Sequence, residues 1–236
     1  MLSVVIPVFN EADLVGETVH AVSAFLVATE PEFEIQVVEN GSTDDTLAIA
    51  TALAESIPQV RVQHLSDADY GAALRAGLLA ARGDVVVNFD VDYYDFDFLT
   101  RAVAAIRAET PDAPDVVVGS KRAPGATDTR PWYRRLVTWT FTQLLHLLFG
   151  MRVSDTHGIK ALRRRTVTPI AQRCLFGKDL FDTELVLRSE RANLFVTEIP
   201  VSVIERRPSR TSILRRVPRT ILGLLRLRIA LLRNPM

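Results

Sequence analysis

The sequence contains little that could form a disulfide bond or span a lipid bilayer. Its single cysteine, Cys174, excludes an internal disulfide and suits a reducing compartment. There is no uninterrupted apolar run of about 18–20 residues, so no transmembrane helix is predicted. The first residues, Met1–Ile6, lack the basic region of a secretory signal and lead directly into a strand-like run. We therefore expect a cytoplasmic protein.

Acidic residues are absent from Arg206 onwards, although the formal net charge of the chain is zero. Every charged side chain in this segment is an arginine: Arg206, Arg207, Arg210, Arg215, Arg216, Arg219, Arg226, Arg228 and Arg233. The asymmetry predicts an anionic partner, either a nucleic acid or a membrane surface. No aromatic stacking platform accompanies the arginines, which alternate with Leu and Ile, so no nucleic-acid partner is expected.

Short apolar runs and longer amphipathic stretches alternate through the first half of the chain. The expected strands are Ser3–Pro7, Glu34–Glu39, Val60–Leu65, Asp84–Phe89 and Asp115–Ser120. The expected helices are Glu11–Thr29, Thr43–Ser56, Ala72–Ala81 and Asp97–Ala108. This alternation predicts an α/β fold with a mostly parallel central sheet and helices on both faces. Ligands of such sheets bind at the carboxyl ends of the strands.

The pattern changes after Lys121. Pro131–Phe149 is expected to be a helix, and it has more large apolar side chains than one buried face needs. The segments Met151–Leu162 and Phe176–Glu190 follow, and then an expected strand, Leu194–Ile204. Ile213–Leu232 mixes Ile, Leu and Val with arginine, which is typical of a basic amphipathic helix at a membrane interface. The alternative is that these two apolar helices pack on the domain or form a dimer contact.

Asp90 and Asp92 follow the apolar run Val85–Phe89. On an extended strand, the i, i+2 spacing orients both side chains toward one face. Two carboxylates at a strand end are suitable ligands for Mg2+ or Mn2+, which prefer oxygen. Alternatively, the two residues cap the next helix or face solvent.

Several short motifs occur in a fixed order along the chain. They are Val5–Glu11, Val37–Asp44, Asp69–Gly71 with Ala76–Gly77, Ala81–Asp84, Asp90–Asp92, Gly119–Arg122, Asp155–Lys160 and Phe181–Glu184. This series resembles the family 2 glycosyltransferases with the GT-A fold. Within that family it is most similar to the branch that contains dolichol-phosphate mannosyltransferase and polyprenyl-phosphate glucosyltransferases.

The resemblance implies inverting, metal-dependent transfer of a hexose from a nucleotide-sugar donor, GDP-mannose or UDP-glucose, to a polyprenyl phosphate. It implies a GT-A catalytic domain over residues 1–212, with a nucleotide-sugar half, 1–120, and an acceptor half, 121–212. Residues 213–236 would form the amphipathic helix. The enzyme would be peripheral at the inner face of the membrane, with a membrane subunit or a second copy of the chain as further partners. Alternatives are transfer to a hydroxyl of a glycan or small molecule, and an inactive membrane-associated scaffold.

The resemblance also implies roles for residues that would bind the donor. Asp90 and Asp92 would be the metal ligands, with Asp92 on the ion that bridges the diphosphate and Asp90 also close to the sugar or ribose. Tyr94 stands where lipid-phosphate members often place a Gln. The base and ribose site would be lined by Pro7, Phe9, Asn10, Glu11, Glu39, Asn40, Gly41, Ser42 and Asp69.

On the acceptor side, the matched motifs offer Asp155 and Glu184 as general bases if the acceptor is a hydroxyl. An acceptor phosphate is already anionic and needs cations instead. In the family, arginines hold the acceptor phosphate, and Arg122, Arg134 and Arg135 resemble them. Alternatively, these three residues form a solvated basic edge. The remaining phosphate-contacting candidates belong to the loop Arg206–Ser212 and are Arg207, Arg210 and Ser212.

Overall fold

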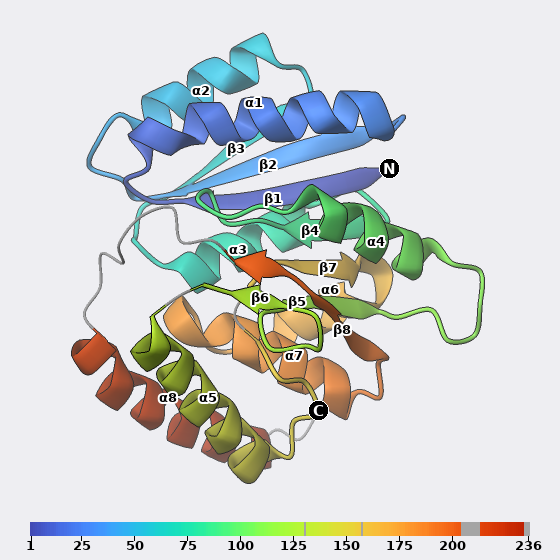
Figure 1. The fold of residues 1–236 in the computed structure, drawn as a ribbon. Helices are drawn as coiled ribbons and strands as arrows, with labels where there is room; N and C mark the ends of the chain where they lie inside the picture. The colour runs from blue at the N-terminus through green and yellow to red at the C-terminus, as the bar shows by residue number, and fades with distance from the viewer. Residues whose placement is uncertain (130, 157, 204–212, 234–236) are drawn as a thin grey trace.

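A computed structural model describes residues 1–129, 131–156, 158–203 and 213–233. Its seven-stranded sheet has the order β3-β2-β1-β4-β7-β5-β8 (Figure 1). The strands are β1 (Leu2–Val8), β2 (Phe33–Asn40), β3 (Val60–Leu65), β4 (Val85–Asn88), β5 (Val116–Ser120), β7 (Lys160–Arg163) and β8 (Val196–Pro200). All neighbours are parallel except β7, which is antiparallel to both β4 and β5. A small second sheet pairs β6 (Thr127–Asp128) with β9 (Ser202–Val203).

Helices cover both faces of the sheet, so its central strands are almost wholly apolar. On one face lie α1 (Ala12–Thr29), α2 (Thr46–Ser56) and α4 (Phe96–Arg107). On the other lie α3 (Tyr70–Ala80), α6 (Arg164–Arg173) and α7 (Phe181–Arg191), which follows a 3-10 turn, η1 (Lys178–Leu180). Two further helices, α5 (Trp132–Phe149) and α8 (Ile213–Arg233), complete this second face.

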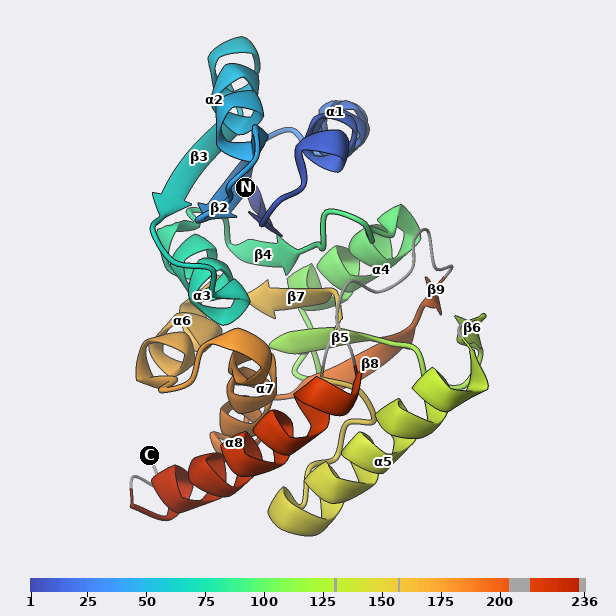
Figure 2. The same cartoon turned by 90° about the vertical axis from the view of Figure 1, so that its left-hand side faces the viewer.

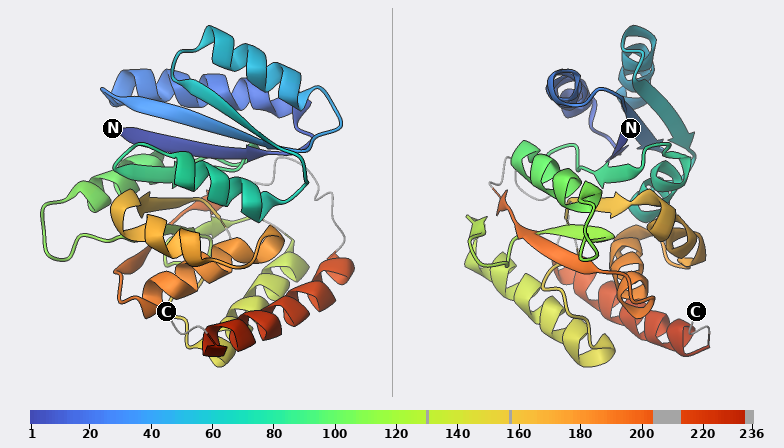
Figure 3. Two further views of the ribbon diagram at one scale, coloured as in Figure 1. Left: turned by 180° about the vertical axis from the view of Figure 1, so that it is seen from behind. Right: turned by 90° about the vertical axis from the view of Figure 1, so that its right-hand side faces the viewer.

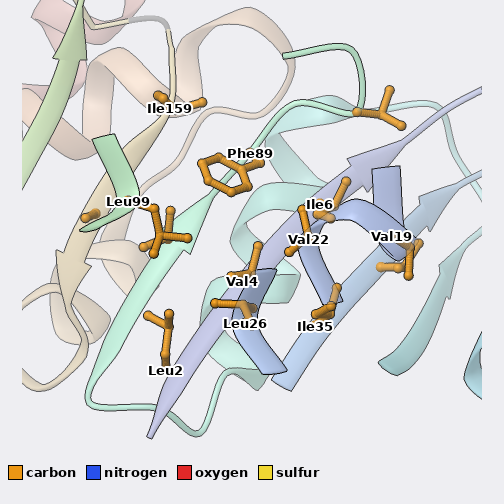
Figure 4. Close-up of a cluster of buried hydrophobic side chains, with 14 of the residues drawn as sticks. Leu2, Val4, Ile6, Val19, Val22, Leu26, Ile35, Phe89, Leu99 and Ile159 are labelled. Carbon is orange, nitrogen blue, oxygen red and sulfur yellow. The ribbon is translucent and has the colours of Figure 1, made fainter. Parts of the chain in front are cut away.

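The first face carries the core in which α1 packs on β1 and β2. Figure 4 shows Val19, Val22 and Leu26 of α1 against Ile6 of β1 and Ile35 of β2. All five side chains are fully buried. By length and composition α1 is the one described helix that could cross a membrane, but its apolar stripe lies in this core.

The helices α5 and α8 lie side by side at the edge of the domain farthest from β3, as Figures 2 and 3 show from several directions. Arg228 of α8 donates a hydrogen bond from its Nη1 to the carbonyl oxygen of Leu148 at 2.9 Å, which ties the two helices together. On its inner side α8 buries Leu224, Leu227 and Leu231 in the second core.

The predicted fold class is confirmed, with two local differences. The strand β7 begins inside the segment Met151–Leu162, for which the sequence predicted no strand. The helix expected from Thr43 begins only at Thr46. The Asp44 carboxylate accepts hydrogen bonds from the Thr46 backbone at 3.0 Å and from its hydroxyl, so residues 43–45 form a loop before the helix.

Candidate active site

Asp90 and Asp92 lie at the carboxyl end of β4, which ends at Asn88. The backbones of Asp90 and Tyr93 exchange two hydrogen bonds, each 3.1 Å long. The carboxylates are thus carried by a tight turn, and the prediction that an extended strand aligns them is wrong. The turn nevertheless keeps the two side chains in electrostatic contact.

Asp90 lies at the centre of a group of carboxylates. Its Oδ1 accepts a hydrogen bond from the Tyr70 hydroxyl at 2.8 Å. Burial raises the pKa of Asp90, and the nearby carboxylates of Asp92 and Asp182 raise that pKa further, whereas Tyr70 and Lys160 lower it. Asp90, Asp92 and Asp182 are three acidic side chains around one buried ammonium group, that of Lys160. The surplus of negative charge favours the binding of a divalent metal ion.

Lys160 of β7 and Asp182 of α7 form a buried ion pair beside Asp90. The Lys160 Nζ lies 2.6 Å from Asp182 Oδ1, and the two side chains are 0% and 6% exposed. The same Nζ donates to the Gly158 carbonyl oxygen at 2.7 Å. Lys160, Asp182 and Tyr70 all belong to the motifs described above, but the sequence analysis predicted no role in the site for any of them. Lys160 and Asp182 come close to Asp90 because β7 is inserted next to β4 in the sheet.

The donor set is suitable for a divalent cation that is shared with a substrate. In the described part of the chain, His, Cys, Asp and Glu side chains form no group of three that could hold a metal ion. Mg2+ and Mn2+ are commonly bound by one or two carboxylates, with substrate phosphates and water as the other ligands. The pair Asp90 and Asp92 fits this arrangement.

Two loops at the same edge of the sheet are hydrogen-bonded to each other. The Asn10 backbone N–H donates to Ser42 Oγ at 2.9 Å, and the Thr43 N–H donates to Asn10 Oδ1 at 2.8 Å. Gly41 has a φ of +79°, and a Cβ there would lie 2.8 Å from the carbonyl oxygen of Ser66. Pro7 is buried at the end of β1, whereas Phe9 is 40% exposed and Glu11 is half-buried. This edge therefore offers the aromatic ring of Phe9 to a ligand, beside two loops that their own hydrogen bonds hold in place.

Three residues predicted to contact the nucleoside are instead occupied inside the protein. Glu39 is fully buried, and it accepts from the Ser42 N–H and contacts His64 Nδ1, both at 2.5 Å. Asn40 bonds the Val8 carbonyl and the Asp69 N–H. Asp69 caps α3 through Oδ1, which accepts from the Ala72 N–H at 2.9 Å. These contacts shape the edge of the sheet, and direct contact of the three side chains with the nucleoside stays a prediction.

We expect Glu39→Gln to reduce stability at neutral pH by about 1 kcal/mol, because charge-assisted hydrogen bonds are stronger than neutral ones. Burial opposes ionisation, but the bonds from Ser42 and His64 outweigh it and lower the pKa of Glu39 below its ordinary 4.5. A lowered folded-state pKa stabilises the protein above the unfolded pKa, and this stability is lost as pH falls through the folded pKa. Urea unfolding at pH 7 and below pH 4 measures the effect, and a difference between the proteins that persists undiminished in acid would contradict it.

Asp155 lies on the loop that leads into the amino end of β7, next to the carboxyl end of β5. The Glu198 carboxylate of β8 accepts from the backbone N–H groups of Ser154 and Asp155, both at 3.0 Å. The Asp155 side chain is 4% exposed, with the Lys121 Nζ 3.7 Å away. Asp155 raises the pKa of Tyr93, as does Asp90, although burial of that hydroxyl is the largest cause. Asp155 thus borders the carboxylate group, and its role as a base stays a prediction.

Glu184 does not face this site. It is fully buried, and its Oε2 accepts from the backbone N–H groups of Leu175 and Phe176 at 2.8 and 2.9 Å. Its Oε1 is 2.8 Å from Arg188 Nε, one helical turn further along α7. With both oxygens engaged inside the domain, Glu184 is a structural residue, and its prediction as a general base is wrong.

The predicted phosphate-binding arginines are only partly described. Arg122 is half-buried in the loop after β5, and its backbone N–H donates to Ser120 Oγ at 3.2 Å. Arg135 is exposed in the first turn of α5, and Tyr94 is half-buried beside Phe96. The side chain of Arg134, and the whole of Arg207, Arg210 and Ser212, lie outside the described residues.

A mostly parallel sheet that carries carboxylates at its carboxyl edge suits the binding of a cation together with an anionic ligand. The chain belongs to glycosyl transferase family 2, whose family model matches residues 3–169. It is a glycosyltransferase with the GT-A fold.

The similarity to individual proteins covers more of the chain than the family model does. The chain is 33% identical over 207 residues to the glycosyltransferase AglD of Haloferax volcanii, covering 85% of this chain but only 32% of AglD. It is 32% identical to the polyprenol monophosphomannose synthase of Mycolicibacterium smegmatis, covering 86% of this chain and 77% of that protein. The crystal structure of glucosyl-3-phosphoglycerate synthase from Mycobacterium tuberculosis, in complex with Mn2+ and UDP, has a TM-score of 0.68 at 22% identity, over 97% of this chain and 79% of the other.

Proposed function

We propose that the chain transfers a hexose, with inversion, from a nucleoside-diphosphate sugar to a polyprenyl phosphate. The observation that carries this proposal is the charged group at the carboxyl edge of the sheet, in which the half-buried Asp90 and Asp92 lie beside the buried pair of Asp182 and Lys160. The name of the mycobacterial relative, a polyprenol monophosphomannose synthase, supports the acceptor and favours mannose as the sugar. GDP-mannose and UDP-glucose are the donors to test.

Asp90 and Asp92 would hold a Mg2+ or Mn2+ ion together with the donor diphosphate. When bound, the ion neutralises charge that develops on the leaving diphosphate. Tyr70 holds the Asp90 carboxylate in place through its 2.8 Å hydrogen bond. The crystal structure with Mn2+ and UDP supports this use of a divalent ion in the same fold.

The acceptor phosphate would attack the anomeric carbon as the bond to the diphosphate breaks, so the displaced oxygen takes the bonding electrons. A phosphate oxygen is already anionic at neutral pH and requires no strong base. Arg122, together with Arg134 and Arg135, would hold it by charge-assisted hydrogen bonds. If the acceptor is instead a hydroxyl, Asp155, which borders the carboxylate group, is the candidate base in place of Glu184.

A transfer assay with radiolabelled donors tests the proposal. Purified protein receives GDP- and UDP-hexoses, Mg2+ or Mn2+, and a short polyprenyl phosphate in detergent. We expect label from one donor to enter the organic phase, and EDTA to abolish the transfer. If a nucleotide sugar binds but no lipid product forms, the acceptor assignment is wrong. A hydroxyl acceptor or an inactive scaffold then explains the chain better.

A membrane surface is proposed to cover the outer faces of α5 and α8. Large apolar side chains are exposed on both helices, among them Trp132 (74%), Trp139 (48%), Leu222 (50%) and Ile229 (50%). Arg226 and Arg228 are exposed beside them on α8. An anionic leaflet suits this combination, because apolar side chains enter the headgroup layer while each arginine contributes about 1 kcal/mol. A lipid-linked acceptor would be presented at the same surface.

We expect Trp139→Glu and Leu222→Glu each to weaken binding to vesicles with anionic lipid by about tenfold, since each exchanges buried apolar area for a repelled charge. Co-sedimentation with vesicles measures the binding. Val27→Glu is the matched control, because Val27 is 67% exposed on α1, across the sheet from α5 and α8. Equal losses in all three variants would show that added charge alone is responsible and would contradict the proposed surface.

A further inference from the structure

The 3-10 turn η1, directly before α7, is held on one side by the start of α3. Two glycines meet there: a Cβ on Gly71 would lie 2.7 Å from the Gly177 carbonyl carbon and 2.8 Å from the Lys178 nitrogen. The Lys178 N–H donates to Asp69 Oδ1 at 2.5 Å. Lys178 adopts a φ of +46°, a conformation that costs free energy in a residue with a side chain. The position of the turn is therefore tightly determined.

On its other side the turn is covered by α8. A Cβ on Gly223 would lie only 2.3 Å from Leu180 Cδ1, so the Leu180 side chain fits against helix backbone at the one glycine of α8. Leu180 is 8% exposed, and the adjacent Leu224 and Leu227 of α8 are fully buried. Because protein interiors are closely packed, a shift of α8 moves Leu180 or opens a cavity beside it.

The turn leads directly to the carboxylate group. Asp182 lies two residues after Leu180, in the first turn of α7, and pairs with Lys160 at 2.6 Å. On the opposite side of the turn, Tyr70 precedes Gly71 and bonds to Asp90. A single three-residue element thus joins α8 to two of the groups that surround Asp90.

We propose that Leu180 is a positioning residue through which the docking of α8 sets the place of Asp182 in the active site. The helix has two apolar faces: Leu224, Leu227 and Leu231 point into the domain, whereas the face with Leu222 and Ile229 is exposed. When a membrane holds the outer face, the inner face is fixed on Leu180, and Asp182 with it. Contact with the lipid surface then promotes turnover in addition to bringing the acceptor close. The inference rests on the proposed function.

A double-mutant cycle between Leu180 and Gly223 tests this role. Leu180→Ala leaves a cavity, and Gly223→Ala forces a methyl group into Leu180, so each change alone displaces the turn. We expect each to lower kcat with vesicles by about tenfold or more, because small misplacements of reacting groups are costly. The double variant, in which the new methyl group fills part of the cavity, is expected to recover most of kcat. Leu180→Met, which conserves volume, retains it.

The readouts separate positioning from general damage to the fold. The Kd for donor nucleotide and the binding to vesicles are expected to change little in the variants, whereas kcat changes. The melting temperatures of the two single variants are expected to fall but to stay above the assay temperature. Val27→Ala is the matched control, since Val27 is 67% exposed on α1, outside the proposed membrane surface, and its change leaves the contact with Leu180 intact. At saturating vesicle concentration we expect it to keep the wild-type kcat.

Hydrogen exchange of the amides in residues 178–184 gives a readout that does not depend on the acceptor. We expect vesicles to slow this exchange in the wild type and to have no effect in Leu180→Ala. The positioning role would be overturned if the losses of kcat in the two single variants simply add in the double variant. It would also be overturned if vesicles leave the amide exchange of residues 178–184 in the wild type unchanged. If the wild type transfers no label to polyprenyl phosphate but the vesicle effect on exchange persists, the proposed function fails and the coupling through Leu180 stands.

Discussion

Replacement of Asp92 by Asn is expected to reduce sugar transfer by about a hundredfold to a thousandfold, the range found when a group that stabilises developing charge is removed. The substitution keeps the size of the side chain but removes one of the two carboxylates available to the ion. A neutral amide oxygen binds a hard divalent cation more weakly than an anionic carboxylate does. The radiolabel transfer assay measures the rate, and a titration with Mn2+ is expected to show a much higher metal requirement.

Asp95→Asn is a matched control for this prediction. Asp95 lies three residues further along and caps α4 by accepting from the Phe98 N–H at 2.9 Å. Asn caps helices about as well as Asp, so the same chemical change is expected to leave transfer near the wild-type rate. If Asp92→Asn keeps a third or more of the activity at the wild-type metal concentration, Asp92 is not a metal ligand.

The largest effect on stability is expected for Lys160→Met. The Lys160 side chain is fully buried against Asp182, so its removal leaves an unpaired carboxylate beside Asp90 and Asp92. Breaking a buried ion pair from one side typically costs about 3–5 kcal/mol. For a chain of this size, that corresponds to a fall in melting temperature of roughly 6–20 °C. Thermal unfolding followed by circular dichroism measures the change.

Two further variants make this prediction specific. Arg101→Met removes an ion pair of similar length, 2.7 Å to Asp97, but both of those side chains are largely exposed, so we expect a loss below about 1 kcal/mol. Lys160→Met combined with Asp182→Asn removes the uncompensated charge and is expected to recover part of the stability. A double variant less stable than Lys160→Met alone would contradict the explanation by unpaired charge.

Asp90 and Asp92 could be predicted from the sequence because an apolar strand that ends in carboxylates is a local pattern. The strands of the first 120 residues and most helices followed from periodicity for the same reason. Lys160 and Asp182 could not be paired in advance, because their contact depends on where β7 enters the sheet. The burial of Glu39, Asn40 and Glu184 is equally a consequence of packing. Their motifs predicted a position near the site, but they did not predict partners from distant segments, such as His64 for Glu39.

The insertion of β7 between β4 and β5 has a consequence for how the protein folds. β5 pairs with β7 and β8 and has no contact with β4 as a neighbour in the sheet. While the first 120 residues emerge from a ribosome, β5 therefore lacks both of its partners, and β4 presents an unpaired edge. Contacts between such distant segments form slowly, and exposed edges favour association with other chains. We expect residues 1–120 expressed alone to aggregate, and the whole sheet to fold as one cooperative unit.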